Sequence, residues 1–327
     1  PDGRVIDEED PAFRSTQFFL WLNPIARHID VEYGKKVLTF AYFFTEPPPH
    51  CAVEPNIRIS FCPIAKNSKR ALTHPENAGT LKRLTGWLRV TDNITWREYY
   101  GLCQAFPRPI DAVALQDWRY LNGYGIHRTY SEMRPDLPSV GRYTKTWHVN
   151  AMYFWVLANG AWNPGRGVGE LRREFLSRVF GPAAGDVAEF YRLIEEQWFR
   201  LPGVSRYGDK AYVNWRKHVF DTGIVPECRE ALKRAAAKVA HPHAARMLAG
   251  MQSVLDEQLL LWEHESVRAV RTETPPEFDP SFRDGAWRLV ASNGRFLLNR
   301  TEEPFRHPTS VRALYDEQNL YFGFQCG

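Results

Sequence analysis

Charged and aromatic side chains gather in one short stretch of the sequence, Asn93 to Gly101, with the letters NITWREYYG. Its residues Ile94, Thr95 and Trp96 favour an extended backbone. An arginine, a glutamate and two tyrosines follow without a break, and at the end of a strand these groups can bind and protonate a polar ligand. In a β/α barrel such strand ends carry the chemistry. A surface strand with a solvated Arg/Glu pair is the alternative.

A second carboxylate, Glu132, follows the next predicted strand. Glycoside hydrolysis uses a carboxylic acid that protonates the leaving oxygen and a second group that stabilises the developing charge, which can be the acetamide of the substrate itself. Because parallel strands of a barrel end in one mouth, we expect Glu98 and Glu132 to project together as a catalytic pair. The alternative is that both are solvated carboxylates at the rim.

Further residues near these strand ends are candidates for substrate binding. Arginine can fork onto the oxygens of a uronate or an acetamide, and Trp and Tyr offer flat faces for sugar C–H groups. We therefore expect substrate contacts from Tyr42, Trp96, Arg97, Tyr99, Arg128 and Tyr130. For each aromatic residue core packing is the alternative, and for each arginine a structural ion pair. His127 is expected to lie inside a strand as an interior histidine.

The composition indicates a soluble globular protein of roughly two domains, because 327 residues with 44% hydrophobic side chains can bury a sizeable core. The 42 basic and 38 acidic residues are mixed along the chain, so we expect no nucleic-acid partner. No apolar run is long enough for a membrane span. The five cysteines and the histidines lack the spacing of metal ligands, and no glycine-rich phosphate loop follows the first strand; we expect no metal and no cofactor.

Predicted strands and helices alternate in the first 140 residues. The predicted elements are a helix at 13–29, strands at 37–44 and 56–61, a helix at 80–90, a strand beginning at 94, a helix at 111–121 and a strand at 123–130. The continuous apolar run at 37–44 is typical of a parallel strand buried on both faces. This order predicts an α/β fold, the C-terminal half of a (β/α)8 TIM-like barrel. A small doubly wound domain is the structural rival.

Beyond residue 140 the pattern changes twice. Residues 141–270 show successive helical patterns and are expected to pack on the partial barrel of residues 1–140. Residues 271–282, rich in Pro, Thr and Glu, have the composition of a linker. Alternating residues at 310–315, a turn, and a second run at 320–324 predict a hairpin. We assign it to the start of a β-sandwich-like domain, residues 283–327.

Several motifs in this order resemble a known family, the domain of unknown function numbered 4838. They are the stretch from Asn93, then Phe106-Pro, Asp117-Trp-Arg-Tyr-Leu-Asn-Gly-Tyr-Gly with Ser131-Glu132, Ala161-Trp-Asn-Pro164 and Phe180-Gly-Pro-Ala-Ala184. The resemblance implies a barrel like that of β-hexosaminidases, with some members acting as endo-β-N-acetylglucosaminidases. Others carry a domain similar to that of α-glucuronidases. Separately, Asp284-Gly-Ala-Trp287, Thr309–Asp316 and Asn319–Phe324 resemble the opening of a family 9 carbohydrate-binding module.

These inferences together predict a glycosidase that acts on glycans containing N-acetylhexosamine and is secreted or periplasmic, as the resemblance implies. An α-glucuronidase-like hydrolase and a non-catalytic glycan-binding protein on a degenerate barrel are the alternatives. The chain begins without Met, and a half barrel leaves two open sheet edges. We therefore expect a fragment that is poorly soluble or inactive alone. The resemblance places an acid/base pair at or before its first residues.

Overall fold

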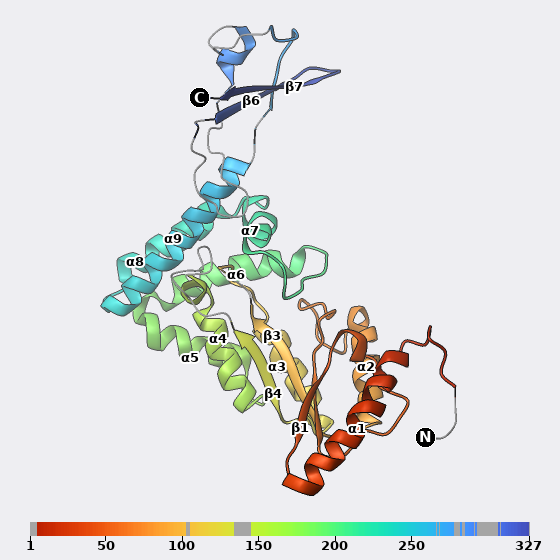
Figure 1. Cartoon of the computed structure of the whole chain (residues 1–327). Coiled ribbons are helices and arrows are strands. Elements are labelled where there is room, and N and C mark those ends of the chain that lie inside the picture. The colour runs from red at the N-terminus through yellow and green to blue at the C-terminus, as the bar shows by residue number, and fades with distance from the viewer. Residues whose placement is uncertain are drawn as a thin grey trace. The chain divides into compact units, whose positions relative to one another are not determined.

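The computed structural model describes residues 5–102, 105–133 and 145–265, and in the C-terminal region residues 267, 269–277, 282, 285–290, 292, 307 and 309–326. The chain divides into two compact units, residues 1–254 and residues 255–327 (Figure 1). Each unit is described by itself below.

A parallel four-stranded sheet organises the first unit, with the strands in the order β1-β2-β3-β4. Its strands are β1 (Val37–Ala41), β2 (Ile57–Phe61), β3 (Ile94–Gly101) and β4 (Thr129–Met133). Helix α1 (Phe13–Tyr33) precedes the sheet, α2 (Ala78–Leu88) connects β2 to β3, and α3 (Asp111–Gly123) connects β3 to β4. The mixed α/β class and the parallel pairing agree with the sequence prediction, whereas closure into a barrel stays a prediction.

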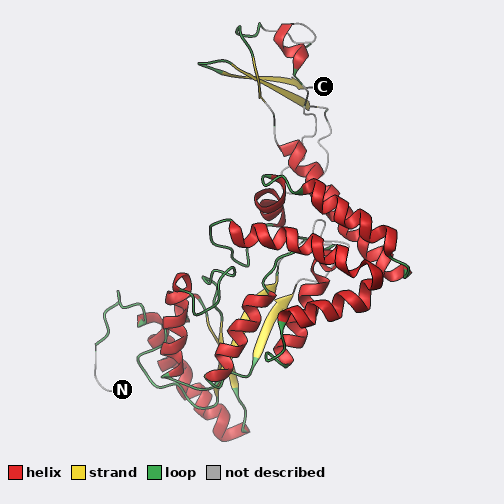
Figure 2. Ribbon diagram, turned by 180° about the vertical axis from the view of Figure 1, so that it is seen from behind, coloured by secondary structure: helices red, strands yellow, loops and turns green. Residues whose placement is uncertain are grey.

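One face of the sheet, called here the helix face, carries the core. Side chains from β2 and β3 are fully buried there against residues of α1 to α4, and the helices lie in front of the strands in Figure 2. The strand residues of this core include Ile57, Ile59, Phe61, Ile94 and Trp96. Because side chains alternate along a strand, their sequence neighbours point to the opposite face.

The opposite face, called here the open face, leaves large apolar side chains exposed. Leu38 is 63% exposed, Phe40 42% and Tyr130 51%. The strand register pairs Phe40 with Ser60, Ser60 with Thr95, and Arg97 with Tyr130. Paired residues of neighbouring strands point to the same side, so these side chains share the open face. The expectation that residues 37–44 are buried on both faces is therefore wrong, because the helices that follow the strands cover one face only.

Two strands, β1 and β4, differ in their bounds from the predictions. The first strand stops at Ala41 because a 3₁₀ turn, Phe43–Thr45, follows, in which the Thr45 hydroxyl donates to the carbonyl of Phe40 at 2.8 Å. Strand β3 begins at Ile94 as predicted and continues past Glu98 to Gly101. The fourth strand begins only at residue 129, because α3 extends to residue 123 and Gly125 then turns with a φ of 76°. His127 is consequently exposed in a loop, not interior.

Helices follow one another from residue 146, as predicted. They are α4 (Thr146–Trp162), α5 (Val168–Phe180), α6 (Ala184–Arg200), α7 (Ala211–Trp215), a π-helix (Arg216–Phe220), α8 (Val225–Lys238) and α9 (Pro242–Glu265). Phe106, in the connection after β3, packs against the rings of Trp198, Trp215 and His218. This contact places α6 and α7 beside the C-terminal end of the sheet (Figure 1).

The second unit contains a small sheet in which β5 (Ala269–Arg271) runs parallel to β6 (Thr309–Tyr315) and β7 (Leu320–Cys326) antiparallel to it. The predicted hairpin is confirmed, with Tyr315 paired to Leu320. Phe282, Trp287, Val290 and Leu314 form its core. A β-sandwich stays a prediction. Within the described residues, every helix is too short or too polar to traverse a bilayer.

Candidate functional site

Strand β3 sends two neighbouring charged residues to opposite faces of the sheet. Arg97 lies on the open face and Glu98 on the helix face, as the alternation of side chains along a strand requires. Arg97 forms an ion pair and hydrogen bond with Glu132 of β4, and both side chains are partly exposed. The two carboxylates predicted to share one mouth, Glu98 and Glu132, are thus separated by the sheet.

Aromatic rings on the open face flank the Arg97 guanidinium. Its central carbon lies 5.1 Å from the centre of the Phe40 ring and 4.6 Å from that of Tyr130. Partial burial lowers the pKa of Arg97, but the hydrogen bond and charge of Glu132 outweigh this and raise the pKa above its ordinary value. The arginine is therefore a fixed, positioned cation at the ends of β3 and β4.

A cluster of tyrosines lies at the C-terminal end of the same face. Tyr99 stacks on Tyr207 with ring centres 4.5 Å apart and an angle of 26° between the planes. Burial raises the pKa of Tyr99, with further contributions from Cys62 and from a hydrogen bond with Tyr42. Burial also raises the pKa of the Cys62 thiol to about 11, which keeps it protonated. Tyr42 follows β1 and Cys62 follows β2, so the cluster spans three strand ends.

Tyr207 was not predicted, because the sequence places it far from every strand, in the connection between α6 and α7. Burial raises its pKa, as does a hydrogen bond with Tyr42, and the charge of Glu132 contributes too. The local signal in the sequence is an aromatic residue between two glycines, Gly203 and Gly208. We define the strand-end cluster as Tyr42, Cys62, Arg97, Tyr99, Glu132 and Tyr207.

Glu98 belongs to a separate buried cluster on the helix face. The amino group of Lys66 lies 3.2 Å from the Glu98 carboxylate and 2.9 Å from that of Asp117. Asp117 also accepts a hydrogen bond from the backbone N–H of Leu72 at 2.6 Å. Burial raises the pKa of Glu98, helped by the charge of Asp117 and opposed by that of Lys66. Glu98 is 4% exposed, and this cluster ties β3 to α3 and to the β2–α2 connection.

Two predicted binding residues lie away from the strand-end cluster. Trp96 is fully buried on the helix face, stacked on Phe61 with ring centres 5.7 Å apart. Arg128 precedes β4, at the opposite end of the sheet, where it donates to Asn93 at 2.7 Å. Trp96 thus packs in the core, and Arg128 is bonded to a neutral amide at the end of the sheet away from the cluster. Tyr130 stays on the open face, beside Arg97.

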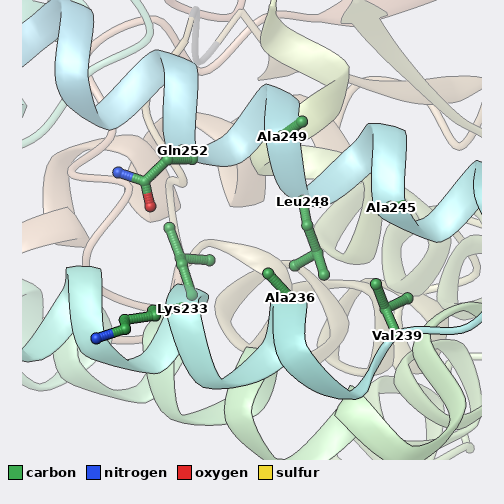
Figure 3. A pocket seen from close by; sticks show the side chains of 8 residues that line it. Lys233, Ala236, Val239, Ala245, Leu248, Ala249 and Gln252 are labelled. Carbon is green, nitrogen blue, oxygen red and sulfur yellow. The ribbon is translucent and has the colours of Figure 1, made fainter.

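An apolar groove of about 340 Å³ lies elsewhere in the first unit, between α8 and α9 (Figure 3). It is lined by Leu232, Lys233, Ala236, Val239, Ala245, Leu248, Ala249 and Gln252. The lining contains no carboxylate, imidazole or hydroxyl, so it lacks the groups needed for general acid–base chemistry. Among the described residues there is no group of three His, Cys, Asp or Glu side chains suited to a metal ion.

The fold and the strand-end cluster define the chain as an α/β protein with polar and aromatic groups at the ends of parallel strands. Residues 4–192 match the family model of a domain of unknown function, DUF4838. The match covers more than half of the 327 residues, and the chain belongs to this family. No curated protein and no solved structure matches the chain.

Proposed function

We propose that this chain contributes the sugar-binding part of a glycoside hydrolase that acts on glycans containing N-acetylhexosamine. The observation that carries the proposal is the strand-end cluster, which combines stacked tyrosines with a positioned Arg97–Glu132 pair on one face of a parallel sheet. Aromatic faces, hydroxyls and a charge-assisted pair are the groups with which proteins hold a sugar. Secretion or a periplasmic location belongs to the same proposal, on the resemblance alone.

The proposal includes a barrel of which these four strands form half. Its support is the parallel order, the helices on a single face and the exposed apolar side chains of Leu38 and Phe40 on the other. In a complete (β/α)8 barrel the open face would point inward and would be filled by side chains from other strands. The strand-end cluster would then lie in the mouth of the barrel.

Each residue of the cluster has a role in the proposed reaction. Glu132 stabilises the positive charge that develops on the sugar, and Arg97 orients the Glu132 carboxylate and a substrate oxygen. The tyrosine rings stack on the apolar face of the sugar. Glu98 has no role as the acid, because its buried carboxylate faces α3. The acid that protonates the leaving oxygen lies outside the strand-end cluster.

Enzyme assays of the full-length protein on aryl N-acetylglucosaminides, N-glycoproteins and aryl glucuronides test this proposal. We expect turnover of an N-acetylhexosaminide and a fall of about 10²–10⁴-fold in kcat for Glu132→Gln. The matched variant Glu98→Gln should stay within about threefold of the parent, because this carboxylate lies on the helix face beside Lys66 and is separated by the sheet from the strand-end cluster. Absence of turnover on all three substrate classes would contradict the proposal.

Two alternatives rest on specific features of the cluster. Among the described residues, Glu132 is the one carboxylate of the strand-end cluster, which favours a non-catalytic glycan-binding protein. Arg97, with rings on two sides, suits a uronate carboxylate and favours an α-glucuronidase-like hydrolase. Sugar binding without turnover would select the first alternative, and turnover of aryl glucuronides alone would select the second.

A further inference from the structure

We propose that the loop of residues 201–210 is a sugar-binding loop and that its Tyr207 forms, with Tyr99, a stacking platform for a pyranose ring. The inference rests on the proposed function and deepens it. Tyr207 lies beyond residues 4–192, the part that matches the family. The helical region after the family domain would therefore supply part of the binding site.

The contact between Tyr207 and Tyr99 joins the loop to the strand ends. The two rings are stacked, with their centres 4.5 Å apart and 26° between their planes. Tyr99 is 7% exposed, whereas Tyr207 is only half-buried. Tyr207 thus forms the accessible layer of the pair, with Tyr99 as its rigid base.

Backbone and side-chain hydrogen bonds fix the loop to the connection that follows β2. The backbone N–H of Ser68 donates to the carbonyl of Ser205 at 2.8 Å, and the N–H of Ser205 donates to the Asn67 side chain at 3.1 Å. The Lys69 amino group donates to the carbonyls of Trp198 and Leu201, at 2.8 and 3.1 Å. Both the start and the middle of the loop are thus tied to buried side chains.

The Ser205 hydroxyl is the second anchor of the loop. It donates to Asp209 at 2.8 Å and accepts from Arg108 at 3.1 Å, and Ser205 is 1% exposed. Asp209 also accepts from the backbone N–H of Arg206 at 3.0 Å. Tyr207 is held between these anchors, so its ring is positioned before a ligand arrives. A preorganised aromatic loop loses little conformational entropy on binding, which raises affinity.

The chemistry of the platform indicates the class of ligand. A tyrosine face binds the apolar C–H face of a pyranose. Tyr99 follows Arg97 by two residues in β3 and lies on the same face, so the platform adjoins the Arg97–Glu132 pair. A sugar stacked on Tyr207 can therefore direct a hydroxyl or acetamide toward that pair. An N-acetylhexosamine, with an apolar face and an acetamide, has both features.

Calorimetric titration of the full-length protein with N,N′-diacetylchitobiose, and in parallel with glucuronate, tests the platform. We expect binding by the parent, an affinity loss of about five- to tenfold for Tyr207→Ala, and a change below about twofold for Tyr207→Phe, because the ring is kept. Ser205→Ala should also weaken binding severalfold, since it frees the loop without removing the ring. Tyr33→Ala, an exposed tyrosine on α1, is the control and should bind like the parent.

The possible results distinguish failure of the Tyr207 platform from failure of the proposed sugar-binding function. Binding by the parent that is unchanged in Tyr207→Ala would overturn the platform and leave the proposed function standing. Failure of the parent to bind either sugar would overturn both. If Tyr207→Ala does not fold, the affinities of Tyr207→Phe and Ser205→Ala decide. An equal loss of affinity in both variants would overturn the stacking role, because Tyr207→Phe keeps the ring on which the sugar stacks.

Discussion

Two charged clusters on opposite faces of β3 show how one strand serves two purposes. Glu98, Lys66 and Asp117 are enclosed between the sheet and the helices, whereas Arg97 and Glu132 pair on the open face with partial exposure. Removing one partner of a buried ion pair leaves an uncompensated charge in the core, which costs several kcal/mol. The fold therefore depends on the buried cluster staying complete, whereas the exposed pair stays available to a ligand.

The largest effect is expected from removing the cation of the buried cluster. Lys66→Met leaves two carboxylates facing each other in the core, and breaking a buried ion pair in this way costs about 3–5 kcal/mol. The free energy of unfolding from urea titration measures this loss. Adding Glu98→Gln should restore part of it, because one negative charge is removed. Lys82→Met on the exposed side of α2 is the control, with an expected change within about 0.5 kcal/mol.

The two faces of the sheet should also respond differently to loss of apolar side chains. Ile59→Ala on the helix face removes a fully buried side chain and should cost about 2–5 kcal/mol. Leu38→Ala on the open face should cost less than about 0.5 kcal/mol in this chain, since the side chain is 63% exposed. Urea unfolding of both variants checks the comparison. Equal losses would show that the open face is covered in solution.

The raised pKa of Glu98 predicts a pH dependence of stability. A carboxyl group whose folded-state pKa is raised stabilises the fold fully below its ordinary pKa of 4.5, and this contribution is lost as the pH rises through the folded-state pKa. Glu98→Gln removes that titration. The stability of the parent relative to the variant should therefore fall with rising pH, by about 1.4 kcal/mol per pH unit within this window. Urea unfolding of both proteins across the pH range measures it; a constant difference would contradict a raised pKa.

The smallest effect is expected from Arg128. Its replacement, compared with that of Arg97, shows which of the two arginines proposed from the sequence contacts the sugar. Arg128→Ala removes an exposed hydrogen bond to Asn93 at the far end of the sheet and should change sugar affinity less than about twofold. Arg97→Ala should lower that affinity about tenfold or more, because it removes the positioned cation and leaves Glu132 unpaired. Calorimetric titration with the same sugars compares the two variants. A larger loss for Arg128→Ala would contradict the placement of the site.

Local patterns determined the elements of this protein well. The parallel strands, the helices between them and the hairpin from residue 309 follow from apolar periodicity and turn residues, which act over a few positions. The motifs from Asn93 onward identified the family, which the match over residues 4–192 confirms. The same patterns placed Tyr42, Arg97, Tyr99 and Glu132 near strand ends, where the structure brings them together.

Which face each side chain occupies was decided only by the tertiary structure. The sequence predicted Glu98 and Glu132 at the ends of successive strands, in one mouth. Glu98 instead lies inside β3, and the alternation of side chains turns it toward Lys66 and Asp117. Tyr207 could not be assigned to the site either, because its partner Tyr99 is distant in sequence and meets it only through the docking of the 201–210 loop. Residue type and local pattern act within one element, whereas burial, pairing and long-range contact depend on how the elements pack.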